Sequence, residues 1–429
     1  MLIIYTEYIT NRLQYIATTL FGDDIVITND INTFIGFDGK KINYSTNNIL
    51  SSDVRIKPVN LLFEKTISNQ HIECFSWKDY KAFYKTEGDI PFDVFAASFY
   101  LLSRYEEYLT DFKKDLHGNF HHENSLAWKE NFLQQPLINF WLIEIEKKFK
   151  IDARKNQFKV IPTFDVDISF AYKHHPWYIQ FGGLLKDLIY NRGTFKHRLQ
   201  VLFDYRKDPY QNFSWLNELI EKYDLNPIYF FLVSEKRGKK DKNPSPEKKE
   251  VKHLIQQLAN RYSIGIHPSF QSNFSEEKLI DEIKILKTIT NKSIPNSRQH
   301  YLQLKFPFTY KSILQHGILE DYTLGYGTHN GFRASYTYPY YWYNLENETE
   351  SALRLHPFCY MDSNSIFEQN ISSKKALQEM EKYFEITKSV NGDFIFIMHN
   401  HFLTEQKKWK DWKKIFQEFL QFISTSSSS

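Results

Sequence analysis

The sequence predicts an α/β fold in two domains. Three observations support this prediction: a length of 429 residues, a charged segment near residues 147–158, and an alternation of apolar strands with amphipathic helices after that segment. A chain of this length exceeds one ordinary core. Strands that alternate with helices are typical of parallel sheets. We therefore expect a smaller α+β domain over residues 1–155, an α/β domain over 156–423, and a disordered serine-rich tail over 424–429.

The expected first domain begins with a strand at residues 2–8 and an amphipathic helix at 11–22 that ends on a glycine. Residues 35–45 read as a hairpin, because an Asp-Gly pair is a typical two-residue turn between strands. No sequence feature indicates what this domain contributes to function.

A further helix is predicted near residues 91–109. Phe95, Phe99 and Leu102 recur at helical spacing and form one apolar stripe, which we interpret as core. The charged end of this segment, residues 104–108, is either a solvated face or a contact with the second domain.

The alternation in the second domain is regular. Strands are predicted at residues 160–164, 227–233, 262–266, 298–306 and 393–398, and helices at 214–223, 245–258, 276–288 and 404–423. Two segments interrupt it. Residues 173–208 are basic and aromatic and predict a lid, a cleft wall or a helical excursion, whereas 235–245 predict a solvated surface loop.

The composition excludes several classes of protein. The formal net charge of +3 does not favour a nucleic-acid partner. With Cys74 and Cys359 alone there is no disulfide framework, and a metal would need His, Asp or Glu ligands. The first residues do not resemble a secretory signal, and the apolar runs are too short to span a bilayer. The sequence thus predicts a soluble, cytoplasmic protein without a transmembrane segment; it does not indicate the oligomeric state.

Polar residues follow the predicted strands. In parallel α/β folds the active site gathers at the carboxyl ends of the strands. Four such ends supply Asp165 and Asp167, His267, Arg298 and His300, and His399, Asn400 and His401.

Asp165 and Asp167 should face the same side of their strand, because side chains two residues apart in a strand point together. Two carboxylates cannot both stay ionised cheaply in a dry site. A divalent ion on one of them would keep the pair deprotonated and lower the pKa of a bound water, and mixed Asp and His ligands suit zinc. This reasoning predicts a hydrolase.

Five motifs occur in a fixed order: "TFDVD" at 163–167, "GIHPS" at 265–269, "SRQHY" at 297–301, "DYTLGY…GFRAS" at 321–335 and "FIFIMHNH" at 394–401. Together they resemble the NodB-homology polysaccharide deacetylases. The whole chain is similar to a two-domain bacterial subgroup with a "LLSRYEEY" segment in its first domain. The resemblance implies a deformed (β/α) barrel and metal-dependent removal of acetyl groups from N-acetylated sugars.

The resemblance also implies roles for the first two motifs. Asp165 matches the general base and Asp167 a metal ligand, although the usual motif has adjacent aspartates. His267 matches the first of two metal histidines, but the second position holds Gln271. The missing ligand is then His300 from the neighbouring strand, or else Ser269, Gln271 or water.

Arg298 matches an arginine that orients the base. Tyr301 matches its aromatic companion, a substrate contact whose backbone amide could hold the oxyanion. His399 matches the general acid, whereas His401 reads as a supporting or surface residue. Arg333 is expected either to bind substrate or to form a buried ion pair with Asp321.

The predicted function is therefore hydrolysis of an acetyl or similar acyl bond on a saccharide or glycolipid, with zinc as the expected metal and cobalt or manganese as alternatives. A second hypothesis is a glycan-binding module that lost full ligation, as Gln271 could indicate. A third is a membrane-surface protein that uses residues 174–198 as an interfacial helix, although its glycines and modest hydrophobicity weigh against this.

Overall fold

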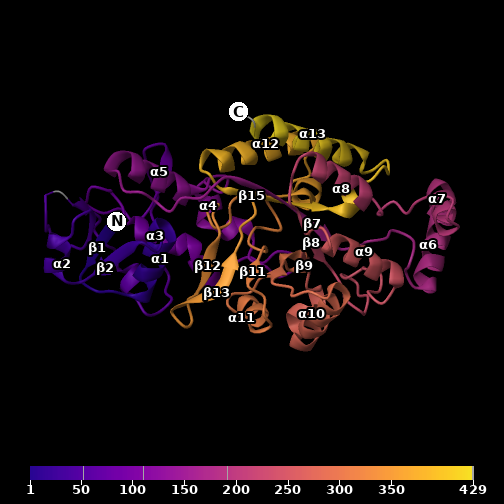
Figure 1. The fold of residues 1–429 in the computed structure, drawn as a ribbon, viewed down its shortest axis with the longest axis horizontal. Helices are drawn as coiled ribbons and strands as arrows, with labels where there is room; N and C mark the ends of the chain where they lie inside the picture. Colours follow the sequence, from indigo (N-terminus) through magenta and orange to yellow (C-terminus); the bar gives the residue numbers. More distant parts are fainter. Residues whose placement is uncertain (52, 110, 191, 428–429) are drawn as a thin grey trace.

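The computed structural model describes residues 1–51, 53–109, 111–190 and 192–427. The molecule is elongated: the N-terminal region lies at one end, the larger sheet lies in the middle, and a pair of helices stands at the other end (Figure 1). These are α6 (Trp177–Tyr190) and α7 (Arg192–Leu202). No helix of the described ranges is both long and apolar enough to cross a bilayer.

The N-terminal region contains a four-stranded parallel sheet in the order β2-β1-β3-β4. Its strands are β1 (Leu2–Thr6), β2 (Ile25–Thr28), β3 (Lys40–Tyr44) and β4 (Val54–Arg55). The helix α1 (Asn11–Phe21) joins the first two strands and ends at Gly22, as predicted.

The hairpin predicted at residues 35–45 is wrong. Residues Ile31–Gly36 form a short helix, α2, whose first turn is capped by Asp30. The Asp-Gly pair leads from that helix into β3, which runs parallel to β1 and buries Ile42 and Tyr44. The turn signal was real, but it joins a helix to a strand.

The remaining elements of this region pack on the sheet and against the second region. They are β5 (Phe75–Trp77), β6 (Tyr80–Ala82), α3 (Val94–Leu102), α4 (Leu126–Lys129) and α5 (Leu137–Phe149). Every residue of α3 is buried, which confirms its assignment to the core. The ring of Phe99 lies 5.2 Å from that of Tyr343 in the second region, so one continuous core joins the two regions.

The second region is built on a nine-stranded sheet in the order β12-β13-β11-β10-β9-β8-β7-β15-β14. Its pairings are parallel except for the antiparallel pairing of the edge strand β12 with β13. The strands are β7 (Lys159–Val166), β8 (Ile228–Phe231), β9 (Ser263–Ile266), β10 (Asn296–Ser297), β11 (Glu320–Asp321), β12 (Tyr340–Asn344), β13 (Thr349–Leu355), β14 (Tyr360–Met361) and β15 (Asp393–His399). The mixed α/β class is confirmed. Within the described ranges no pairing joins β12 to β14, so a closed barrel stays a prediction.

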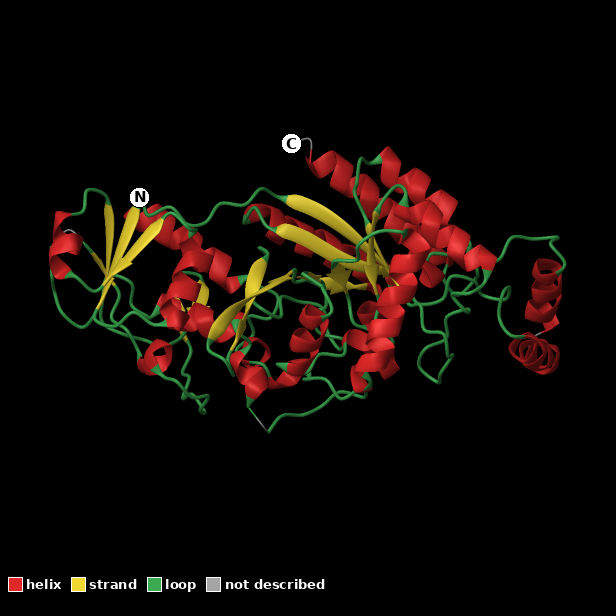
Figure 2. Ribbon diagram, turned by 60° about the horizontal axis from the view of Figure 1, so that its bottom comes forward, coloured by secondary structure: helices red, strands yellow, loops and turns green. Residues whose placement is uncertain are grey.

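Helices cover the sheet on both sides (Figures 1 and 2). They are α8 (Phe213–Lys222), α9 (Lys249–Ala259), α10 (Glu276–Thr290), α11 (Phe308–Gln315), α12 (Ser373–Ser389) and α13 (Lys410–Ser427). In Figure 1, α12 and α13 lie together above the sheet, and α10 and α11 lie below it.

Two predictions about element ends are corrected. The serine-rich tail was predicted to be disordered, but α13 continues to Ser427. The helix is anchored by the buried side chains of Phe419, Leu420 and Ile423. Residues 428 and 429 lie outside the described ranges. The strand predicted at 298–306 is wrong: β10 ends at Ser297, before that range, and the chain then turns into a short 3-10 helix at His300–Leu302.

Candidate active site

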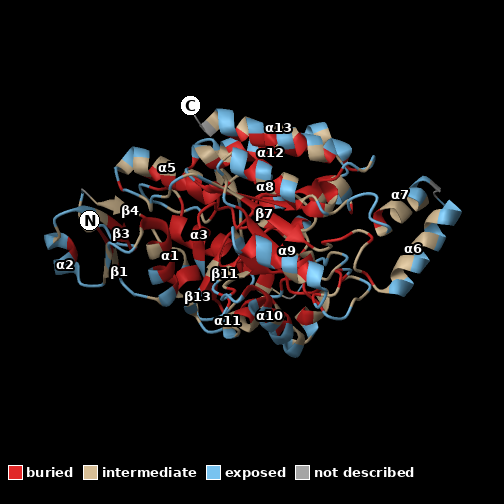
Figure 3. Cartoon of the chain, turned by 45° about the vertical axis from the view of Figure 1, so that its right-hand side comes forward, coloured by how far each residue is buried: buried red, intermediate tan, exposed pale blue. Residues whose placement is uncertain are grey.

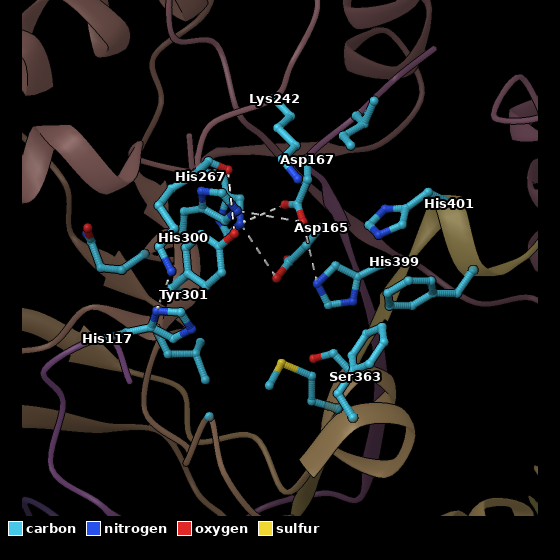
Figure 4. A pocket seen from close by; sticks show the side chains of 18 of the residues that line it. His117, Asp165, Asp167, Lys242, His267, His300, Tyr301, Ser363, His399 and His401 are labelled. Atoms are coloured by element: carbon cyan, nitrogen blue, oxygen red, sulfur yellow. Dashed lines mark hydrogen bonds and ion pairs between the residues drawn. The ribbon is translucent and has the colours of Figure 1, made fainter. Parts of the chain in front are cut away.

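The polar strand ends meet at one edge of the sheet. In the β7–β15 ladder Asp165 is the register partner of His399, and β8, β9 and β10 continue the sheet on the other side of β7. The backbone N–H of His267 donates to the carbonyl of Phe231, and the backbone N–H of Arg298 donates to the carbonyl of Ile266. These hydrogen bonds fix the positions of both residues at the edge of the sheet. The side chains of Asp165, Asp167, His267, His300 and His399 line a cavity of about 430 Å³ (Figure 4).

Three side chains converge on one point of this cavity. The ligand atoms of Asp167, His267 and His300 all lie within 4.8 Å of one another. His267 Nε2 is 3.1 Å from Asp167 Oδ1, and His300 Nε2 is 3.8 Å from Asp167 Oδ2. The dashed lines of Figure 4 mark these approaches. Asp167 and His267 are the ligands that the resemblance implies, and His300 is one of the alternatives that the sequence left open for the missing ligand.

The Nδ1 atom of each of these two histidines makes a hydrogen bond to a protein group. His267 Nδ1 donates to the carbonyl of Arg298 at 2.6 Å, and His300 Nδ1 donates to the Asp241 carboxylate at 2.9 Å. Because Nδ1 is the donor in both rings, each Nε2 is turned toward Asp167 in the cavity. Such outer partners are the usual support of metal-binding histidines.

The donor set fits a divalent cation. Asp167 Oδ1 is buried and accepts no hydrogen bond from a described residue, which is costly for a carboxylate oxygen unless a cation lies nearby. Although burial raises the pKa of Asp167, the nearby His300, His267 and His399 lower it well below its ordinary value. One carboxylate and two imidazoles with an open side match the composition of catalytic zinc sites.

Asp165 lies beside this group and is held by Arg298. The guanidinium Nη1 donates to Asp165 Oδ1 at 3.0 Å and to Thr163 Oγ1 at 2.7 Å, while Nε donates to the Tyr322 carbonyl at 2.9 Å. The other Asp165 oxygen lies 3.9 Å from His267 Nε2. A buried arginine fixed at three points orients this carboxylate at the wall of the cavity.

His399 closes the opposite side of the cavity, with Nε2 3.8 Å from Asp167 Oδ2. Its Nδ1 donates to Asp362 Oδ1 at 2.5 Å, and its backbone N–H donates to Asp362 Oδ2. Burial lowers the pKa of His399, but the charge and hydrogen bond of Asp362 outweigh burial and raise it to about 10. The ring is therefore a proton donor at neutral pH.

His401 also lines the cavity. Burial and the charge of His399 lower its pKa to about 3, so this ring is neutral at neutral pH. It is a half-buried pocket residue, and its supporting role stays a prediction.

Tyr301 lines the cavity on a strained stretch of backbone, with φ 57° at Tyr301 and 49° at Leu302. Its ring centroid lies 4.2 Å from that of His300 and 4.3 Å from that of His117. His117 comes from the N-terminal region, so both regions form the pocket wall. Non-glycine residues in this conformation concentrate at functional sites.

Three residues named by the sequence do not reach the cavity. Arg333 neither lines it nor pairs with Asp321; its guanidinium binds Glu107 instead. Asp321 accepts hydrogen bonds from Ser297 and Thr323. Gln271 binds the Lys278 ammonium group and is no substitute ligand.

Sequence reasoning missed two acidic supports. Asp241 lies in the segment predicted as a solvated loop, yet it is fully buried under His300, and its neighbours Lys240 and Lys242 line the cavity. A lone acid in a basic run was the only signal. Asp362 follows a strand of two residues, β14, which is too short to recognise from sequence.

Comparisons with known proteins place only part of the chain. Residues 2–152 match a family of unknown function, DUF7033. No curated protein matches. Solved structures are similar over 62–63% of the chain.

A putative polysaccharide deacetylase from Mycobacterium smegmatis shares 14% identity over 63% of this chain and 85% of its own, with a TM-score of 0.40. PuuE allantoinase shares 11% sequence identity over 62% of this chain and 84% of its own, also with a TM-score of 0.40. A CE4 family pseudoenzyme from Bacillus anthracis shares 9% sequence identity over 62% of each chain, with a TM-score of 0.31. Scores this low carry no weight for function, which has to come from the geometry of the site.

Proposed function

We propose that this protein is a divalent-metal-dependent hydrolase that removes an acetyl or similar acyl group from an N-acetylated saccharide or glycolipid. The observation that carries the proposal is the convergence of Asp167, His267 and His300, with both Nε2 atoms turned toward Asp167. A second carboxylate, that of Asp165, lies beside them and is held by Arg298. The order of the sequence motifs supports the same reaction class, including a deformed barrel as its framework.

Asp167, His267 and His300 would hold the cation, with zinc as the best match to the donor set. A bound dication supplies Lewis acidity: it lowers the pKa of water and polarises the acyl oxygen. Asp165 takes the proton of the attacking water, because the hydrogen bond from Arg298 holds its carboxylate at the cavity wall.

His399 gives a proton to the departing nitrogen or oxygen, since Asp362 keeps its ring protonated at neutral pH. Tyr301 offers an aromatic face to the sugar ring beside the reacting centre. Arg298 acts through Asp165 and is a positioning residue.

The experiment is acetate release from N- and O-acetylated sugars with zinc, cobalt or manganese added, paired with metal analysis of the purified protein. Asp165→Asn should retain metal and lose turnover. Asp167→Ala, His267→Ala and His300→Ala should lose both. Gln271→Ala is the matched control in the family's expected ligand position and should retain metal.

Gln271 is also the observation that favours the second candidate, a glycan-binding module on the same framework. That candidate predicts saccharide binding without acetate release and with little bound metal. Turnover that is equal in wild type and all the ligand variants would contradict the hydrolase proposal.

A further inference from the structure

The α6–α7 hairpin (residues 173–207) stands away from the body of the protein. It leaves the carboxyl end of β7 just after the pocket residues Asp167 and Ile168, and the chain returns to the body at α8. The hairpin forms the far end of the molecule in Figures 1 and 2. None of the residues of α6 is buried, and the helix shows only exposed and half-buried positions in Figure 3.

The side of α6 that faces α7 makes a polar contact with it. Asp187 Oδ2 pairs with Arg198 Nε at 2.6 Å, and the Arg198 guanidinium passes so close to Gly183 that a Cβ there would lie 2.7 Å from Nη1. One contact between the two helices is therefore an ion pair beside a glycine.

The outward side of α6 is apolar instead. Tyr178, Phe181, Leu185, Leu188 and Ile189 recur at spacings of three and four residues and form one stripe. The side chains are 57%, 57%, 45%, 46% and 71% exposed, respectively. Trp177 and Tyr190, at the two ends of the helix, are 77% and 79% exposed. Contiguous exposed apolar surface of this kind marks an interaction site.

The hairpin is also strongly basic. It holds seven Lys and Arg residues against two Asp residues, in a chain whose whole formal charge is +3. Both acids are neutralised, Asp187 by Arg198 and Asp204 by Lys173. By contrast, no ion pair to another described residue is recorded for Lys186, Lys196, Arg206 and Lys207, which leaves their charge available to a partner.

We propose that the α6–α7 hairpin binds the surface of a bilayer that contains anionic lipids, with the apolar face of α6 lying in the interface. An apolar stripe with aromatic residues at its ends, surrounded by free cations, is the composition of interfacial helices. Fourteen residues give a helix of about 21 Å, which suits lying along the interface. The inference does not depend on the proposed function, although it would bring the pocket to lipid-linked saccharides.

Vesicle flotation of the full-length protein tests this proposal. We expect the wild type to float with vesicles of phosphatidylcholine and phosphatidylglycerol, more weakly at high salt, and far less with phosphatidylcholine alone. The double variant Phe181→Ser/Leu188→Ser should bind these vesicles at least about ten-fold more weakly than the wild type, because each substitution removes apolar surface that is buried in the interface.

A matched control is Phe308→Ser/Leu319→Ser, which removes a phenylalanine and a leucine of similar exposure, 69% and 47%, from another surface. It should float like the wild type. Lys186→Gln/Lys196→Gln should reduce the preference for anionic vesicles, and Trp177→Phe should remove most of the vesicle-dependent blue shift of tryptophan emission.

Three results would overturn the proposal. The first is a wild type that stays with the unbound protein at both lipid compositions. The second is equal flotation of the hairpin double variant and its control. The third is a wild-type dimer by light scattering that the hairpin variant converts to a monomer without any change in flotation, because a second copy would then cover the apolar face.

Discussion

Glu107 of the N-terminal region and Arg333 of the second region form a buried, bidentate ion pair. Arg333 Nε donates to Glu107 Oε1 at 2.9 Å, and Nη2 donates to Oε2. Arg104 completes the group: its Nε donates to Oε1 of the same carboxylate at 2.8 Å, and its Nη1 binds the Arg333 carbonyl. The charged segment 104–108 is therefore a contact between the regions, one of the two alternatives that the sequence left open.

Breaking this pair should destabilise the whole protein. Glu107→Gln leaves two buried arginines with one charge fewer to balance them, and we expect a loss of about 3–5 kcal/mol in the free energy of unfolding by urea. The control Glu346→Gln removes a partly exposed partner of Lys311 and should cost no more than about 1 kcal/mol. A Glu107→Gln protein as stable as the control would show that the pair is dispensable.

Asp362 should set the alkaline limit of activity. In the wild type the pKa of His399 is raised to about 10, so the donor stays protonated through neutral pH. Asp362→Asn removes the raising charge while burial, which lowers the pKa, remains. The alkaline limb of the kcat/KM profile should move toward or below 6.5, the ordinary value. A variant that loses rate uniformly at all pH values would indicate a purely structural role.

Asp241 should tune metal affinity through His300. Asp241→Asn weakens the hydrogen bond that holds His300 Nδ1, and loss of such a partner costs about 10- to 100-fold in affinity. Competition with a chelator measures this directly and needs no substrate. Asp281→Asn, an exposed position on α10, is the matched control and should leave the affinity unchanged. Unaltered affinity in both variants would exclude His300 as a ligand supported by Asp241.

Asp93 should make stability depend on pH between 4 and 6. Burial raises its pKa from 3.8 to about 6, despite hydrogen bonds from Ala96, Val59 and Tyr44. A raised folded-state pKa means that the folded protein holds the proton more tightly. The stabilising contribution of Asp93 is therefore complete below pH 3.8 and is lost as the pH rises through 6. The free energy of unfolding falls by about 3 kcal/mol over this range.

Urea unfolding of wild type and Asp93→Asn from pH 4 to 7 measures the difference. The wild type should lose more stability with rising pH than the variant. Asp30→Asn is a suitable control, because a hydrogen bond from Thr33 lowers the pKa of this exposed helix cap, so its window lies below pH 4. Parallel curves for wild type and Asp93→Asn would contradict the prediction.

Short-range patterns were enough for much of this protein. Period-two and helical spacing predicted β1, β7, β8, β9, β15, α1, α10 and the inward face of α13, because burial of one face imprints itself on nearby residues. The rule that parallel strands end at a common edge predicted that Asp167, His267 and His300 would meet, and their ligand atoms do lie together.

Other features were decided by contacts between residues far apart in the chain. Asp241 and Asp362 support the histidines from a loop and from a strand of two residues, and neither leaves a periodic signal. Arg333 pairs with Glu107, 226 positions away in the sequence, and not with the nearby Asp321. The sequence by itself determined which helices and strands named above form, and which side chains lie at the carboxyl edge of the large sheet. The tertiary structure alone decided which charges pair, because the pairing of buried charges depends on distances that only the folded chain sets.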